Sequence, residues 1–72
     1  MIDIEIKDDM IRLGQFLKLA DVVENGAHAR EVIAAGEVSV NGEIDTRRGR
    51  QLTKGDIVTL STPSGRFDVR VA

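Results

Sequence analysis

Three arginines stand close together in the segment Thr46-Arg47-Arg48-Gly49-Arg50. A guanidinium group is planar and permanently charged, and it can donate two parallel hydrogen bonds to a phosphate or stack on an unpaired base. Gly49 permits a positive φ and leaves room for a phosphate beside the backbone, so the three side chains can surround one site. The segment therefore predicts contact with a polyanion. The alternative interpretation is a solvated turn that keeps a sheet edge soluble.

The charge of the chain is distributed unevenly. Residues 1–45 contain ten acidic and four basic side chains, whereas residues 46–72 contain two acidic and six basic ones, for a formal net charge of −2. A surface divided in this way can attract a polyanion with its basic side although the whole chain is acidic. The net charge alone therefore understates the basic character of the C-terminal part.

Groups that commonly carry out catalysis or hold metals are scarce. The 72 residues include no cysteine and a single histidine, His28, so thiolate chemistry is excluded and no metal site is expected. The serines and carboxylates form no recognisable nucleophile and base pair, and no phosphate-binding glycine loop with lysine and serine occurs. We therefore expect a non-enzymatic protein without a cofactor or small-molecule substrate. No apolar run reaches membrane length, and we expect a soluble cytoplasmic protein.

Hydrophobic periodicity predicts a strand and then a helix at the start of the chain. Isoleucines alternate with charged residues over 2–6, as in a strand with one buried face. Apolar residues at helical spacing predict a helix over 10–20, with Asp8 and Asp9 near its positive end. Gly14 inside this helix lowers its propensity and therefore indicates a close approach by another segment.

A second helix and a tight hairpin are predicted next. The helix covers 26–35, with Asn25 as its N-cap and Gly36 as its left-handed C-terminal residue. Alternating valines then lead into Asn41-Gly42, the strongest two-residue signal for a β-hairpin, and Ile44 continues on the other side.

The remainder of the chain is predicted to be β-structure with short connections. We expect turns at 51–56 and 61–65 and strands at 57–60 and 66–71. Strands grouped outside a helix pair predict the α+β class, and nothing divides residues 1–72 into more than one domain.

Several short motifs of this chain occur together in one known domain. They are Arg12-Leu13, Phe16-Leu17-Lys18, Ala29-Arg30, Val32-Ile33, Gly36, Val38, Val40-Asn41-Gly42 and Gly55-Asp56. The combination resembles the S-four type RNA-binding domain, named after the fourth small-subunit ribosomal protein, over about residues 11–60. More closely, the chain resembles small stand-alone bacterial proteins that consist of little besides this domain.

The resemblance implies both a fold and a function. Two helices and a β-turn would form the L-shaped αL RNA-binding motif, packed on a small, mostly antiparallel sheet with flanking strands at 2–6 and 66–71. The implied function is non-enzymatic binding of structured RNA, either ribosomal or transfer RNA, with the ribosome among the expected partners. We expect a monomer, although a free edge strand near the C-terminus could pair.

The expected RNA-binding residues lie on both helices and on the loops. This chain has Gly14 where the common family pattern has an acidic residue, and Asn25-Gly26-Ala27 where the family has a basic start to the second helix. Contact there would depend on backbone N–H groups at Gly26. If four or five phosphates are neutralised, affinity should fall with salt at a log-log slope of roughly −3 to −4.5. The complete set of expected residues is Arg12, Lys18, Gly26, His28, Arg30, Arg47, Arg48, Arg50 and Lys54.

A protein-interaction module is the alternative function. The same fold could use its basic loop to dock on an acidic protein partner, which the acidic net charge favours. One basic surface shared by Arg12, Arg30 and the loop arginines would favour RNA, whereas an isolated arginine knob would favour a small protein contact. For Arg12 and Arg30, ordinary ion pairs with neighbouring acids are the alternative, the candidates being Asp21, Glu24 and Glu31.

Overall fold

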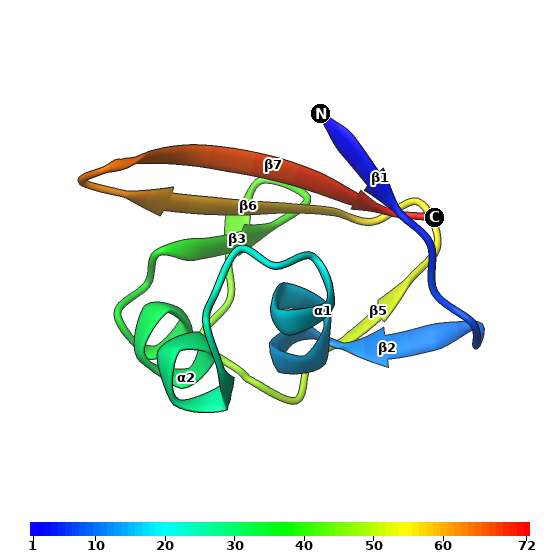
Figure 1. Cartoon of the computed structure of the whole chain (residues 1–72), viewed down its shortest axis with the longest axis horizontal. Coiled ribbons are helices and arrows are strands. Elements are labelled where there is room, and N and C mark those ends of the chain that lie inside the picture. The colour runs from blue at the N-terminus through cyan, green and yellow to red at the C-terminus, as the bar shows by residue number, and fades with distance from the viewer.

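The computed structural model describes residues 1–72 as two helices and seven strands (Figure 1). The helices lie together on one side of the long β6–β7 hairpin, and the β2–β5 ribbon lies beyond α1 (Figure 1). The α+β class predicted from the sequence is confirmed. In chain order the elements are β1 (Ile2–Ile4), β2 (Met10–Arg12), α1 (Leu13–Leu19), α2 (Gly26–Ala34), β3 (Val38–Val40), β4 (Glu43–Ile44), β5 (Gln51–Thr53), β6 (Ile57–Thr62) and β7 (Gly65–Val71).

Five strands form the main sheet in the order β1-β7-β6-β3-β4. Strand β1 pairs in parallel with β7, whereas the other neighbours are antiparallel, so the sheet is mostly antiparallel as expected. β2 and β5 form a separate antiparallel pair. Alternation along the strands sends one face into the core, as the buried residues Val58 and Leu60 of β6 and Val69 and Val71 of β7 show.

The helices supply the other half of the core. Leu13, Phe16 and Leu17 of α1 are completely buried, and Val32 and Ile33 of α2 are nearly so. These residues follow the helical spacing in the sequence, which places them on one face of each helix. Burying each large side chain contributes about 1.5–3 kcal/mol, and this holds both helices against the sheet. Neither helix is long and apolar enough to cross a membrane.

The end of α2 is a glycine-terminated hydrogen-bonded motif. The N–H of Gly36 donates to the carbonyl of Ile33, and the N–H of Glu37 donates to that of Val32. Gly36 has φ +77°, which confirms its predicted role. The N-cap of the same helix is also confirmed, since Asn25 Oδ1 accepts the N–H of His28 at 2.9 Å.

The predicted start of the first helix is wrong. Residues 10–12 form strand β2, and α1 begins only at Leu13, after the extended Arg12. Ile11 pairs with Leu52, which lies far away in the sequence, and this cross-strand contact stabilises residues 10–12 as a strand. Asp8 and Asp9 consequently do not flank the helix as predicted.

The predicted turn at 51–56 is also partly wrong. Gln51–Thr53 is strand β5, the partner of β2, and only the remainder turns toward β6. The first strand ends at Ile4 rather than at residue 6. The strands predicted at 57–60 and 66–71 are confirmed. Each is slightly longer than expected, so the turn between them contains fewer residues than predicted.

The hairpin predicted at Asn41-Gly42 is confirmed, with both residues at positive φ. Asn41 also holds this turn to the next loop. Its Oδ1 accepts the N–H of Ile57 at 2.9 Å, and its Nδ2 donates to Asp56 at 3.0 Å. The asparagine therefore joins two turns that are separate in the sequence.

Candidate nucleic-acid interface

The loop that carries the three arginines is attached to the beginning of α1. It connects β4 to β5, and its backbone carbonyls accept hydrogen bonds from the first residues of the helix. The N–H of Leu13 donates to Arg50 at 2.8 Å, and that of Gly14 donates to Arg48 at 3.0 Å. N–H groups at a helix start have no partner within the helix. The loop supplies these partners and is thereby held in position.

Gly14 allows Arg48 to lie directly against α1. A Cβ atom added at Gly14 would stand 2.8 Å from Cγ of Arg48, closer than carbon atoms can pack. The close approach predicted from this glycine is confirmed, and the approaching segment is the arginine loop itself.

Replacing Gly14 by alanine should therefore move Arg48 more than it changes stability. Alanine gains about 1 kcal/mol of helix propensity, which offsets part of the strain from the new contact. We expect the free energy of unfolding in urea to change by less than about 1 kcal/mol, while the NMR signals of the Arg48 side chain shift clearly. Gly49→Ala is the control, because nothing lies within 4 Å of its added Cβ. Unchanged Arg48 signals in the Gly14 variant would contradict the contact.

A buried carboxylate organises the other two arginines. Asp45 is only 6% exposed. Its Oδ1 accepts the backbone N–H and the Nε–H of Arg47, at 2.9 and 3.1 Å. Its Oδ2 accepts from Arg47 and from Arg50, each at 2.8 Å. Hydrogen bonds from Arg47 and then from Arg50 lower the pKa of Asp45 far below its ordinary value.

This role of Asp45 was not predicted from the sequence. A local signal did exist, because an aspartate can accept the backbone N–H two residues further along the chain in an Asx-turn. Arg47 is placed for that bond. The second contact, to Arg50, depends on how the loop closes and could not be inferred from spacing. Two of the three loop guanidinium groups thus have an internal partner, and Arg48 does not.

A hollow of about 150 Å³ lies where α1, α2 and the loop meet. We call it the basic hollow because Arg12, Lys18 and Arg48 line it. None of these three cations takes part in an ion pair, because the ion pairs of the structure join other arginines to aspartates. The alternative pairing of Arg12 with neighbouring acids is therefore absent. Three unpaired cations around one hollow produce a local positive potential.

The start of α2 adds backbone donors to the same place. Gly26 lines the basic hollow. Because the side chain of Asn25 caps His28, the N–H groups of Gly26 and Ala27 remain without an acceptor in the chain. Free N–H groups and the positive end of the helix dipole both favour an anion.

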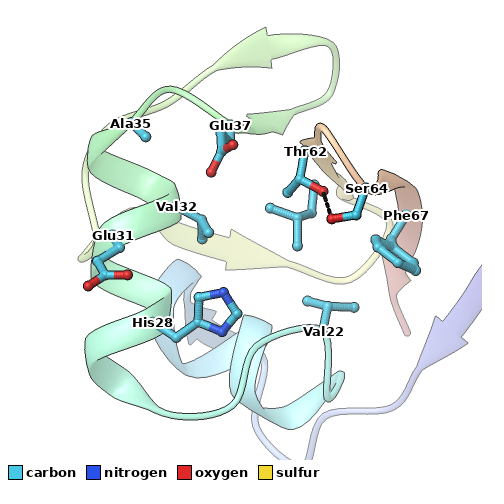
Figure 2. A pocket seen from close by; sticks show the side chains of 10 residues that line it. Val22, His28, Glu31, Val32, Ala35, Glu37, Thr62, Ser64 and Phe67 are labelled. Carbon is cyan, nitrogen blue, oxygen red and sulfur yellow. Dashed lines mark hydrogen bonds between the residues drawn. The ribbon is translucent and has the colours of Figure 1, made fainter.

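The remaining candidate residues lie outside the basic hollow. Arg47 and Arg50 line a separate hollow at the loop, which has no lining residue in common with the basic hollow. Arg30 is exposed on α2 without an ion pair, and Lys54 is exposed in the turn after β5. His28 lines a different groove, between α2 and the β6–β7 hairpin (Figure 2). The structure thus brings together Arg12, Lys18, Gly26 and Arg48, whereas Arg47 and Arg50 line a hollow of their own.

This arrangement occurs in a chain whose sequence matches a known family. The family model described as S4 domain matches residues 4–70, which is nearly the whole chain. The chain belongs to the S4 domain family. The resemblance to the S-four type domain is thus confirmed, and the match extends beyond residues 11–60 to include most of β7 and the last residue of β1.

Bacterial relatives of this S4 domain are of about its own length. A protein of Bacillus subtilis (strain 168) named "Probable ribosome maturation protein RlbA" is 53% identical over 57 residues, which cover 79% of this chain and 80% of the relative. A protein of Escherichia coli (strain K12) named "Putative RNA-binding protein YbcJ" is 34% identical over 55 residues, or 76% of this chain and 79% of the relative. Each match covers more than three quarters of both chains.

Proposed function

We propose that this S4 domain protein binds structured RNA as a non-enzymatic module in the cytoplasm, with ribosomal RNA as its target. The observation that carries the proposal is the convergence of Arg12, Lys18 and Arg48 on one hollow at the start of α2. The names of the two relatives, one an RNA-binding protein and the other a ribosome maturation protein, support the choice of RNA and of the ribosome.

The basic hollow has the chemistry to hold a phosphate of the RNA backbone. Arg12 and Arg48 would donate paired hydrogen bonds to its oxygens, and Lys18 would contribute a positive charge. The free N–H of Gly26 would donate one further hydrogen bond to the phosphate. Arg47 and Arg50 would contact the adjacent phosphates along the strand. Arg30 and Lys54 lie further out, so we assign them only secondary contacts. We assign no RNA contact to His28.

Recognition in this proposal depends on RNA shape rather than on exposed bases. Proteins that recognise single-stranded RNA stack its bases on aromatic side chains. This chain has two phenylalanines. Phe16 is fully buried, and Phe67 lies on β7 outside the basic hollow. A duplex or a junction, which presents phosphates at fixed spacing, is therefore the favoured partner.

The proposal can be tested by recovering RNA crosslinked to the protein in bacterial cells and sequencing it. We expect enrichment of ribosomal RNA segments, lost in an Arg12/Lys18/Arg48→Ala variant that remains folded. With the recovered RNA, the log-log slope of affinity against salt should be roughly −3 to −4.5, as for about four or five phosphate contacts. Equal recovery by both proteins, or affinity insensitive to salt, would refute the proposed interface.

A further inference from the structure

A second concave surface lies on the other side of α2. The groove between α2 and the β6–β7 hairpin has a volume of about 430 Å³, within the range of sites that hold a small ligand or a few side chains. Val22, Ala35 and Phe67 contribute its exposed apolar surface, and the largely buried Val32 and Leu60 lie at its base. Figure 2 shows Phe67 on the wall opposite α2, and this residue is 51% exposed. Such an exposed aromatic beside an apolar hollow is typical of a contact surface.

The charged groups of this groove are carboxylates. Glu37 projects toward the hollow from the segment after α2, and Glu31 lines its edge from the helix, with its carboxylate on the outer side of α2 (Figure 2). Neither carboxylate takes part in an ion pair, and no lysine or arginine lines the groove. Two unpaired negative charges beside an apolar surface favour a ligand that carries both positive charge and an apolar anchor.

His28 adds a directed hydrogen-bond donor. Its Nδ1 accepts the backbone N–H of Glu24 at 3.1 Å. The ring proton of this tautomer is therefore on Nε2. The ring extends from α2 toward the groove (Figure 2), where Nε2–H can donate to a backbone carbonyl of a bound chain. A peptide supplies such carbonyls at every residue.

The apolar surface continues past Phe67. A neighbouring hollow of about 220 Å³ shares Val22 and Phe67 with the groove and adds Met1, Ile2 and Ile4. The one arginine in its lining, Arg66, is paired with Asp68. Met1 and Ile2 are 69% and 63% exposed. Phe67 therefore forms a ridge between two hollows. An extended segment with two apolar side chains could place one on each side of the ridge.

We propose that this groove docks a cationic segment of a protein partner, with an aliphatic or aromatic anchor beside Phe67. RNA does not fit there, because the carboxylates of Glu31 and Glu37 would repel its phosphates. Basic segments are common in proteins that bind RNA, since they neutralise phosphates. The proposal goes beyond RNA binding and does not depend on it. If both the RNA-binding proposal and this one hold, the protein joins an RNA and a basic protein through opposite sides of α2.

The proposal can be tested by NMR titration of the full-length, 15N-labelled protein with defined peptides. The probe is a short peptide in which lysines alternate with leucine and phenylalanine. One control peptide has glutamate in place of lysine, and another has glycine and serine in place of the apolar residues. We expect saturable shifts of backbone amides at Val22, Val32, Glu37 and Phe67 with the probe, and much weaker ones with both controls.

Matched variants distinguish binding in the groove from a general attraction between opposite charges. Glu31→Gln/Glu37→Gln should weaken binding of the probe about fivefold, as expected from two partly exposed ion pairs. Glu5→Gln/Glu43→Gln removes the same charge from exposed positions outside the groove and should change affinity by less than about twofold. Equal loss in both variants, no shifts in the groove, or equal binding of the glutamate peptide would overturn the proposal. Groove shifts caused by an RNA duplex, or by raising the concentration of the protein alone, would also overturn it.

Discussion

Replacing Arg48 by glutamate is expected to lower the affinity for the recovered RNA by roughly 10- to 100-fold, the value of one hydrogen-bonded charged contact. Arg48 is the loop arginine without an internal partner, and it lines the basic hollow together with Arg12 and Lys18. Its backbone is fixed by the hydrogen bond from Gly14, so little conformational entropy should be lost on binding. Fluorescence anisotropy at several salt concentrations measures both the affinity and its salt dependence. The slope should become shallower by about one.

The control for this variant is Arg66→Glu. Arg66 is an exposed arginine on β7, paired with Asp68 and outside the basic hollow. The two substitutions change the net charge equally, so a purely global electrostatic effect would weaken both proteins to the same extent. We expect Arg66→Glu to reduce affinity by less than about threefold at physiological salt, where charges beyond about 8 Å are largely screened. Equal loss of affinity in both variants would contradict a specific site at Arg48.

Replacing Asp45 by asparagine is expected to lower the free energy of unfolding by about 2 kcal/mol. Asp45 is 6% exposed, and its carboxylate accepts four hydrogen bonds from Arg47 and Arg50. Removing one member of a buried charged pair commonly costs about 3–5 kcal/mol. We expect less at this site, because the side chain of Arg47 is 72% exposed and stays hydrated without its partner. Urea denaturation at neutral pH gives the value.

The effect of Asp45 on stability should depend on pH with a defined sign. Because folding lowers its pKa below the ordinary value of 3.8, its ionised form stabilises the native state above that value. The contribution is lost as pH falls and protons bind more readily to the unfolded chain. The difference in unfolding free energy between wild type and Asp45→Asn should therefore have its full value at about pH 6 and decrease below about pH 4.

Comparison with the variant is needed because other carboxylates behave similarly. Hydrogen bonds from Arg70 and from Thr59 lower the pKa values of Asp3 and Asp68. Wild type should thus lose stability in acid for several reasons, and only the difference isolates Asp45. Asp9→Asn is the control, since Asp9 is exposed outside the helices and strands, and it should change stability by less than about 0.5 kcal/mol. A difference between wild type and Asp45→Asn that grows in acid would contradict a lowered pKa at Asp45.

Features that depend on neighbouring residues were predictable. The N-cap at Asn25, the left-handed Gly36 and the turn at Asn41-Gly42 each involve hydrogen bonds or backbone angles within a few positions. The residue type at such positions is restricted by the local backbone, so it can be recognised without the fold. Gly14 belongs with them in part, because the sequence indicated a close approach but not which segment approaches.

Features that depend on distant partners were missed. Met10 and Ile11 are apolar and compatible with either a helix or a strand, and pairing with β5 decided for the strand. β5 itself was predicted as a turn for the same reason, since its partner lies about forty residues earlier. Short apolar segments carry too little periodic signal to choose between the two structures without the tertiary contact.

The sequence by itself determined the family, the α+β class and the concentration of basic charge in the C-terminal part. Only the tertiary structure decided which of the basic side chains have an internal partner. Arg47, Arg48 and Arg50 are equivalent in composition, yet buried Asp45 holds two of them and leaves Arg48 beside Gly14. The physical reason is that an ion pair depends on distance and burial in three dimensions. Spacing along the chain shows which residues are present, and the fold determines which of them meet.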